Sequence, residues 1–426
     1  MSKWMSPWRV AFVQLFVLGL FVLTVGARPV ISDSTLYVDI GNSIARTGAI
    51  AHDGASTAFV TPGYPLFVAG PLKLGGPDAI WLIRLLQAAM LVASGLMLRW
   101  IAQAAGPSTR VGLGVQLLCT IYPPFLIAAG SVMTETLFSF LVVSCTWIYL
   151  FSLRRPAGPD ASSFSILAGA FAASMALVAV RPTGVLLVGA VALVELARWA
   201  RDRGALSHLP AFIAVAMVLG TVAFVGVWGT RNALVLGRFI PFSTEGSYVA
   251  YEGNLLEANG EGAHEEPYAA SVDEATRARI EAGSEVERMD EFSTLLKFEF
   301  TTRRTEILAL WLRKPPRFWL NVGYTNPPSV MSLAVAAFNA TVLVLAAGGL
   351  WLLLRSRTAF CRVTAQVFVL FSVLLMSAHV ATYASLRYAY PALMMLFVPA
   401  GMFLQTVVSR VRGGSDRVGE GAVRRA

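Results

Sequence analysis

The sequence predicts an all-α integral membrane protein of about ten transmembrane helices, with amphipathic helices and one long polar loop on the outer face. Hydrophobic residues make up 56% of the chain and charged residues only 14%, whereas soluble domains carry roughly 25% charged residues. The charges are also gathered, because 15 of the 25 acidic residues lie between Gly229 and Met331. Apolar runs interrupted by one acidic stretch are typical of a membrane protein with one large extramembrane region.

Ten apolar runs approach the length of about 20 residues that a helix needs to cross the hydrocarbon core. They are Val10–Ala27, Ile80–Ala102, Val111–Ala129, Val132–Leu153, Phe164–Val180, Thr183–Leu196, Leu209–Gly229, Val330–Leu354, Val363–Ala384 and Tyr388–Val408. The sixth run is short, and nine or eleven spans are the alternatives to ten. The first run ends in Val25-Gly26-Ala27, which also suits a cleavable signal peptide, although the run is long enough to stay as an anchor.

These runs divide the chain into three parts. Residues 1–229 form an N-terminal transmembrane module that includes a first outer loop at 28–79, residues 230–330 form a long outer loop, and residues 331–426 form a second transmembrane module with a basic tail. The two halves show no internal repeat, and many transporters are built from such repeats. This asymmetry counts against a transporter.

The orientation follows from the basic residues of the short connections, which concentrate on the cytoplasmic side. One set of connections and the tail hold Lys3, Arg9, Arg99, Arg110, Arg154, Arg155, Arg198, Arg201, Arg203, Arg355, Arg357, Arg362, Arg410, Arg412, Arg417, Arg424 and Arg425. The opposite short loops hold only Arg28, Arg46, Lys73, Arg84, Arg181 and Arg387. Both termini are therefore predicted to be cytoplasmic, and the 28–79 and 230–330 loops to face outward.

Composition also limits the partners and cofactors. The net charge of +9 comes from basic residues at span ends, where they orient helices, so it does not indicate a nucleic-acid partner. Cys119, Cys145 and Cys361 lie inside apolar runs and are predicted to be buried packing residues. The four histidines lack the spacing of a helical metal site, so no cofactor is evident, and a divalent metal stays an alternative.

The first outer loop begins with a candidate catalytic residue. Leu36, Ile40 and Ile44 recur every four residues, which predicts an amphipathic helix on the membrane face. Ser32 or Asp33 would cap its start, and that role alone explains an acid at this position. The alternative is that Asp33 acts as a general base that takes a proton from an acceptor hydroxyl. The local pattern leaves both readings open.

Three charged residues mark the outer ends of spans. Glu135 is the one acid between Asp78 and Asp160, and an acid at the mouth of a span usually faces a polar cavity or a cation. Arg181 and Arg387 lie at outer span ends, where an arginine can simply extend to the interface. Together the three could instead form a pocket in which the arginines hold a phosphate.

Polar motifs in the two outer loops complete the candidates. Pro62-Gly63-Tyr64-Pro65 predicts a rigid turn that returns the chain to the membrane. The long loop opens with Arg231 and Asn232 and continues to Gly253-Asn254, and its mixture of glycine, serine, asparagine and tyrosine suits a sugar site or an ordinary loop equally well. The charges that follow alternate in sign at helical spacing, which predicts solvated helices with little chemistry.

In order and spacing these motifs resemble one family. The Asp33 helix, the Tyr64 turn, Glu135, the arginine motifs, Asn254 and the Arg387-Tyr388 pair resemble the GT-C glycosyltransferases related to bacterial protein O-mannosyltransferases and the lipid A aminoarabinose transferase. The resemblance runs from the first span to the last. It implies a bacterial inner-membrane enzyme whose active site lies on the outer face.

What the resemblance implies is transfer of a sugar from a polyprenyl-phosphate donor to a lipid, glycan or protein acceptor. Asp33 and Glu135 match the family's catalytic acids in the first and second outer loops. Arg181, Arg231 and Arg387 fall where cations could hold the donor phosphate, and Tyr64, Asn254 and Tyr388 are the remaining substrate-binding candidates. The competing hypothesis is a transporter or flippase of a lipid-linked intermediate, which would place ionisable residues in mid-span, whereas here nearly all lie at span ends.

Overall fold

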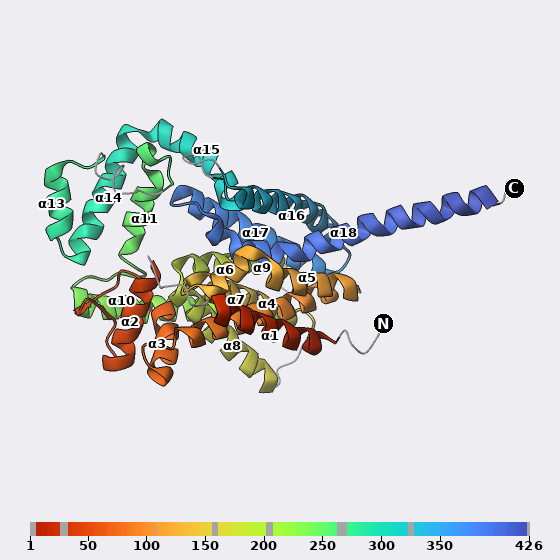
Figure 1. Cartoon of the computed structure of the whole chain (residues 1–426), viewed down its shortest axis with the longest axis horizontal. Coiled ribbons are helices and arrows are strands. Elements are labelled where there is room, and N and C mark those ends of the chain that lie inside the picture. The colour runs from red at the N-terminus through yellow and green to blue at the C-terminus, as the bar shows by residue number, and fades with distance from the viewer. Residues whose placement is uncertain are drawn as a thin grey trace.

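The computed structural model describes residues 6–25, 33–106, 108–155, 161–201, 208–261, 271–322 and 328–423, which form an almost entirely helical molecule (Figure 1). Within these residues nine helices are long and apolar enough to cross a membrane, and one bent pair brings the number to ten. The predicted fold class, an all-α protein of about ten spans, is therefore confirmed. Gly26, Ala27 and Ser32, which the sequence places at the end of the first span and at a helix cap, lie outside the described residues.

The spans follow the predicted runs closely. They are α1 (Pro7–Val25), α4 (Ile80–Ala105), the pair α5 (Thr109–Ile121) and α6 (Pro123–Gly130), α7 (Thr134–Ser152), α8 (Ala161–Val180), α9 (Val185–Arg201), α10 (His208–Leu236), α16 (Val330–Leu354), α17 (Ala359–Ala381) and α18 (Leu386–Val423). The short sixth run is lengthened by a 3₁₀ turn, η2 (Pro182–Gly184), which brings that span to 20 residues.

The third span differs from the prediction of one continuous run. It is bent by 51° between α5 and α6, at Tyr122. Pro123 and Pro124 have no N–H to continue the helical hydrogen bonds, and a residue that precedes proline is pushed to extended backbone, as Tyr122 is (φ −69°, ψ 117°). The Tyr122 hydroxyl donates to Asn339 Oδ1 of α16 (2.6 Å), which ties the bend into the bundle.

The outer segments are more helical than predicted. They contain α2 (Asp33–Thr47), a hairpin of β1 (Ala51–His52) and β2 (Ala55–Ser56), α3 (Gly63–Gly75), α11 (Glu245–Asn254), η3 (Leu256–Ala258), α13 (Glu274–Ala282), α14 (Glu285–Thr302) and α15 (Arg304–Leu320). The predicted turn at Pro62-Gly63 is the start of a helix, α3, because a proline is tolerated where the first N–H groups have no helical partner. The predicted outer segment begins later than residue 230, because α10 continues to Leu236.

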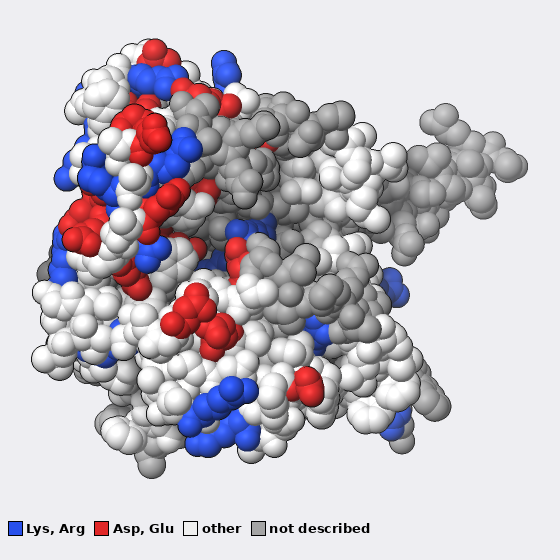
Figure 2. All heavy atoms as spheres, turned by 60° about the vertical axis from the view of Figure 1, so that its left-hand side comes forward, with Lys and Arg blue, Asp and Glu red and all other residues white. Residues whose placement is uncertain are grey.

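The outer helices gather at one end of the molecule. Figure 1 shows α11, α13 and α14 at that end, whereas α18 extends away from the bundle at the other end, where α1 also begins. Figure 2 shows acidic and basic side chains mixed over the outer helices, with a mostly uncharged surface elsewhere on that face. The predicted solvated helices are thus a separate, charged layer. The three cysteines are buried and unpaired, as predicted.

Two close backbone contacts hold the outer loops to the spans. At Gly63, a Cβ would lie 2.5 Å from the backbone of Ala179 in α8, so α3 starts directly against that span. At Gly253, a Cβ would lie 2.1 Å from the carbonyl oxygen of Thr382, so α11 ends directly against the turn after α17. Only glycine fits these positions, and both lie beside the cavity described next.

Candidate active site

A cavity of about 300 Å³ lies where the outer loops meet the ends of the spans. Its walls come from the start of α2, the turn before α3, the starts of α7, α11 and α18, and the ends of α8 and α17. The lining residues are Asp33, Tyr37, Val60, Thr61, Met133, Thr134, Val180, Arg181, Pro182, Thr183, Ser243, Glu245, Gly246, Val249, His379, Thr382, Arg387 and Tyr388. Five regions far apart in the sequence therefore supply one site.

Breaks between helices place the two cavity arginines. Pro182 forces Arg181 into extended backbone (φ −147°, ψ 132°), which ends α8 and directs the side chain toward α7. Arg181 Nη2 lies 2.7 Å from Glu135 Oε1, and Arg181 Nε donates to the Thr134 hydroxyl (2.6 Å). Arg387 lies in the first turn of α18, where the chain has just returned from α17.

Arg387 joins the two predicted catalytic acids. Its Nη1 lies 3.2 Å from Asp33 Oδ2, and its Nε lies 3.8 Å from Glu135 Oε1. The side chain of Glu135 is only 3% exposed, and its second oxygen, Oε2, is buried and has no hydrogen-bond partner among the described residues. Asp33 is more open, with a side chain that is 48% exposed. Glu135 thus lies behind the arginines, while Asp33 faces the cavity entrance.

Aromatic rings form a wall beside the arginines. The rings of Tyr388 and His379 stack with centroids 4.3 Å apart and an interplanar angle of 6°. The guanidinium of Arg181 lies 4.9 Å from the Tyr388 ring centroid, and that of Arg387 lies 5.1 Å from it. Arg387 Nη2 also donates to the Tyr388 hydroxyl (3.1 Å). The ring face therefore stabilises two neighbouring cations by cation–π attraction.

A third carboxylate, Glu245, lines the cavity from the first turn of α11. Burial, and then the negative charge of Asp33, raise the pKa of Glu245 to about 7, against the opposing effect of the arginines. Tyr37, which lines the same cavity, also has a raised pKa because its side chain is buried. Near neutral pH, Glu245 therefore exchanges between its neutral and charged forms.

Glu245 and His379 were not singled out from the sequence as site residues. Glu245 belongs to the polar run from Arg231 to Asn254, which suits a sugar site or an ordinary loop equally well, and His379 is one of four scattered histidines. Each lies near a helix end, Glu245 at the start of α11 and His379 near the end of α17, and neither position carries a distinctive spacing. Only the packing of α11 and α17 against α2 and α18 brings them to the cavity.

Three predicted binding residues lie outside this cavity. Arg231 donates to the backbone oxygens of Thr57 (2.8 Å) and Ile50 (3.0 Å), so it holds the first outer loop. Tyr64 is fully buried, and its hydroxyl donates to Gln87 Oε1 (2.8 Å). Their role in binding stays a prediction, because neither side chain reaches the cavity in this structure.

Asn254 is the third predicted residue outside the cavity. It is 1% exposed and donates to Ala381 O (2.9 Å), while its own oxygen accepts from Trp311 Nε1 (2.7 Å) and Lys314 Nζ (3.3 Å). Asn254 therefore joins α11, α15 and α17. Asn254 thus holds the end of α17 in place, and this end supplies His379 and Thr382 to the cavity wall.

One group of metal-ligating side chains occurs within the described part of the chain. Ligand atoms of Asp39, His52 and Asp53 all lie within 4.8 Å of one another. His52 Nδ1 lies 2.6 Å from Asp39 Oδ2, and His52 Nε2 lies 3.5 Å from Asp53 Oδ2. Each imidazole nitrogen thus already faces a carboxylate, and none of the three residues lines the cavity.

Comparison with known proteins adds a distant likeness. No family model and no curated protein matches the chain. Two crystal structures of ArnT from Cupriavidus metallidurans align with nearly all of it, each at 17% identity. The structure bound to undecaprenyl phosphate covers 95% of this chain and 79% of its own, with a TM-score of 0.43. The apo structure covers 94% and 76%, with a TM-score of 0.40. Both scores are low, so the function proposed next relies on the site itself.

Proposed function

We propose that the chain is a membrane glycosyltransferase. It would move a sugar from a polyprenyl-phosphate donor to an acceptor hydroxyl on the outer side of a bacterial inner membrane. The observation that carries the proposal is the cavity at the span ends, in which Arg181 and Arg387 meet the carboxylates of Asp33 and Glu135. Cations and a partly exposed acid in one cavity suit transfer from a phosphate-linked donor.

The arginines suit the donor phosphate. A guanidinium has five N–H donors in a plane and binds phosphate in a two-bond fork. The hydrogen bonds to Thr134 and Glu135 use only two donors of Arg181, so others remain for a ligand. Because the cavity lies at the ends of α7, α8, α17 and α18, a prenyl chain could stay in the bilayer while its phosphate reaches the arginines.

The charges of the cavity are compatible with an anionic ligand. Asp33 and Glu135 balance Arg181 and Arg387. A third negative charge on Glu245 would oppose a phosphodiester, but the pKa of about 7 lets this group take up a proton near neutral pH. The entering phosphate therefore need not face an unbalanced carboxylate.

In the reaction we propose, Asp33 takes the proton of the acceptor hydroxyl. The acceptor oxygen then forms a bond to the anomeric carbon, and the bond from that carbon to the phosphate oxygen breaks. The electron pair leaves with polyprenyl phosphate, and Arg181 and Arg387 stabilise the negative charge that develops there. Glu135 holds both guanidinium groups in place.

The test uses purified protein in liposomes with a panel of polyprenyl-phosphate sugars and total bacterial envelope lipids as acceptors. Release of free polyprenyl phosphate is followed by mass spectrometry. Wild type should consume one donor, and Arg181→Gln or Arg387→Gln should lower the rate at least about 100-fold. Arg238→Gln is the control, because Arg238 pairs with Asp290 on the surface. Equal rates for the cavity variants and wild type would contradict the proposal.

A further inference from the structure

A second cavity lies between α5, α16 and α18. It holds about 460 Å³ and adjoins an apolar groove of about 550 Å³ along α5 and α18, with Arg110, Val111 and Gln405 in both linings. Gln405 follows Arg387 by 18 residues of α18. At 1.5 Å per residue, this places the groove roughly 27 Å from the candidate active site. It is therefore a separate site at the other end of the bundle.

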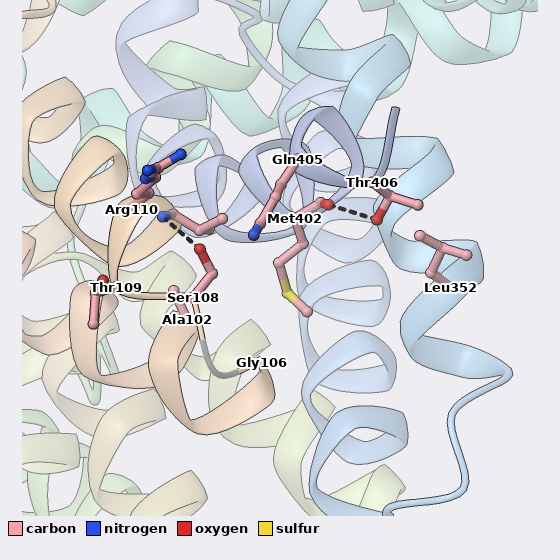
Figure 3. A pocket seen from close by; sticks show the side chains of 10 residues that line it. Ala102, Gly106, Ser108, Thr109, Arg110, Leu352, Met402, Gln405 and Thr406 are labelled. Carbon is pink, nitrogen blue, oxygen red and sulfur yellow. Dashed lines mark hydrogen bonds between the residues drawn. The ribbon is translucent and has the colours of Figure 1, made fainter. Parts of the chain in front are cut away.

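The mouth of this groove is polar. Figure 3 shows Ser108 and Arg110 at the start of α5 across from Met402 and Gln405 of α18. The Ser108 hydroxyl accepts from the backbone N–H of Val111 (3.4 Å). The side chains of Arg110 and Gln405 are exposed, and neither has a hydrogen-bond or ion-pair partner among the residues that the structure describes. The mouth thus offers a cation and an amide to a ligand.

Two glycines keep the rest of the groove open. At Gly401, a Cβ would lie 3.1 Å from the Val111 side chain, so this glycine lets α18 approach α5. At Gly114, no atom lies within 4 Å of the position that a Cβ would take, so open space remains there. Apart from Ser409, the remaining lining is apolar; it includes Val115 and Leu118 of α5 and runs along α18 from Val408 to Phe397.

The length of the groove indicates what could fill it. Eleven residues of helix separate Val408 from Phe397, which corresponds to roughly 16 Å. That is about half of a hydrocarbon core of roughly 30 Å, and so about the depth of one leaflet. An acyl chain of a bilayer lipid has this length, whereas a long prenyl chain would extend beyond the groove.

The charge at this end of the bundle favours an anion. Apart from Arg110, the helix ends and turns here carry Arg99, Arg154, Arg155, Arg198, Arg201, Arg355, Arg357, Arg362 and Arg410. Among the side chains that the structure describes at these helix ends, the acid is Glu195, which is already paired with Arg198. Basic residues near a bilayer surface attract anionic lipids by about 1 kcal/mol each.

We propose that this groove binds an anionic phospholipid of the adjoining leaflet. Its phosphate would lie at the mouth, beside Arg110 and Gln405, and one acyl chain would lie in the groove along Gly114 and Gly401. The occupant is a phospholipid because the groove combines a cationic mouth with the depth of a single leaflet. This inference does not depend on the proposed transferase activity.

The test is native mass spectrometry of the full-length protein in detergent, titrated with phosphatidylglycerol and, separately, with phosphatidylcholine and undecaprenyl phosphate. Wild type should retain phosphatidylglycerol, and Arg110→Gln should weaken its binding about fivefold. Gly114→Leu should abolish binding, because Gly114 lines the groove and a Cβ at this position would extend into open space. The controls are Arg238→Gln, far from the groove and paired with Asp290, and Gly169→Leu on α8, where a Cβ also meets no atom within 4 Å.

The outcomes separate the alternatives. Loss of phosphatidylglycerol in the two groove variants and its retention in both controls would support the proposal. Equal retention by all five proteins would overturn it, since the lipid would then bind elsewhere. A larger loss of undecaprenyl phosphate than of phosphatidylglycerol in the two groove variants, or no discrimination by wild type against phosphatidylcholine, would also overturn it. Because Arg110 is exposed, Arg110→Gln keeps the test valid even if Gly114→Leu fails to fold.

Discussion

A buried lysine gives the most quantitative prediction from this structure. Lys314 of α15 is 1% exposed, and its ammonium donates to Val380 O (2.9 Å), Thr382 O (2.8 Å) and Asn254 Oδ1 (3.3 Å). It therefore links α15 to α11 and to the turn that carries the cavity wall. Burial, and then the charge of Arg317, lower the pKa of Lys314 from 10.5 to about 7.

The shifted pKa makes stability depend on pH. Because the folded pKa is below the unfolded value, the stabilisation is fully present above pH 10.5 and is lost as the pH falls to about 7. At about 1.36 kcal/mol for each unit of pKa, the full difference is roughly 5 kcal/mol. Between about pH 7.5 and about pH 9.5, the free energy of unfolding should rise by roughly 2–3 kcal/mol from this group alone.

Lys314→Met removes the titrating group and keeps an unbranched side chain. The measurement is the free energy of unfolding in detergent micelles, by denaturant titration at several pH values, for wild type and the variant. The wild-type value minus the variant value should rise by roughly 2–3 kcal/mol over that window. Lys297→Met is the control, because Lys297 is exposed on α14. A difference for Lys314→Met that stays flat would refute the reasoning, and would mean that the three acceptors hold the ammonium charged throughout.

Three further predictions concern the loops around the cavity. Wild type should lose stability as the pH rises from 4.5 to about 7, because the pKa of Glu245 is higher in the folded state than in the unfolded state. Glu245→Gln should not show this loss, and unfolding measured at several pH values checks it. Gly253→Ala should destabilise by at least about 2 kcal/mol, since its Cβ would meet Thr382 O, while Gly246→Ala, which meets no atom within 4 Å, should not; thermal unfolding compares them. Glu285→Ala should speed proteolysis of the first outer loop, because Glu285 accepts hydrogen bonds from that loop, and an unchanged cleavage rate would contradict this.

The sequence could predict the spans because hydropathy is a local property. A run of about 20 apolar residues can be recognised without knowing which other segments it contacts in the fold. All ten runs correspond to a helix or a bent pair. The bend at Tyr122 was missed, because an average over the window hides two prolines among strongly apolar residues. The extension of α10 past residue 230 was missed because the polar residues Arg231 and Asn232 suggest a loop, although they lie inside the helix.

The site could be predicted only in part. Arg387 and Asp33 are 354 residues apart, so their contact has no local signal, and the order of motifs along the chain was the one guide to it. Polar residues near span ends looked alike in sequence, yet Arg181 lines the cavity while Arg231 binds backbone oxygens. Lys314 directly follows the segment of alternating charges for which solvated helices were predicted, but the packing of α15 on α17 buries it.

The proposed role of Asp33 as the general base can be tested by comparing two variants of α2 with wild type. Wild type, Asp33→Asn and Asp39→Asn are placed in liposomes in equal amounts with the preferred donor and its acceptor, and the release of polyprenyl phosphate is timed. Asp39 lies on the same helix but pairs with His52, so its variant controls for the fold of α2. We expect a 10²- to 10⁴-fold loss of rate for Asp33→Asn, of the order that general bases contribute, and a wild-type rate for Asp39→Asn. If Asp33→Asn instead transfers sugar at the wild-type rate, Asp33 is not the general base and is only a residue at the start of a helix.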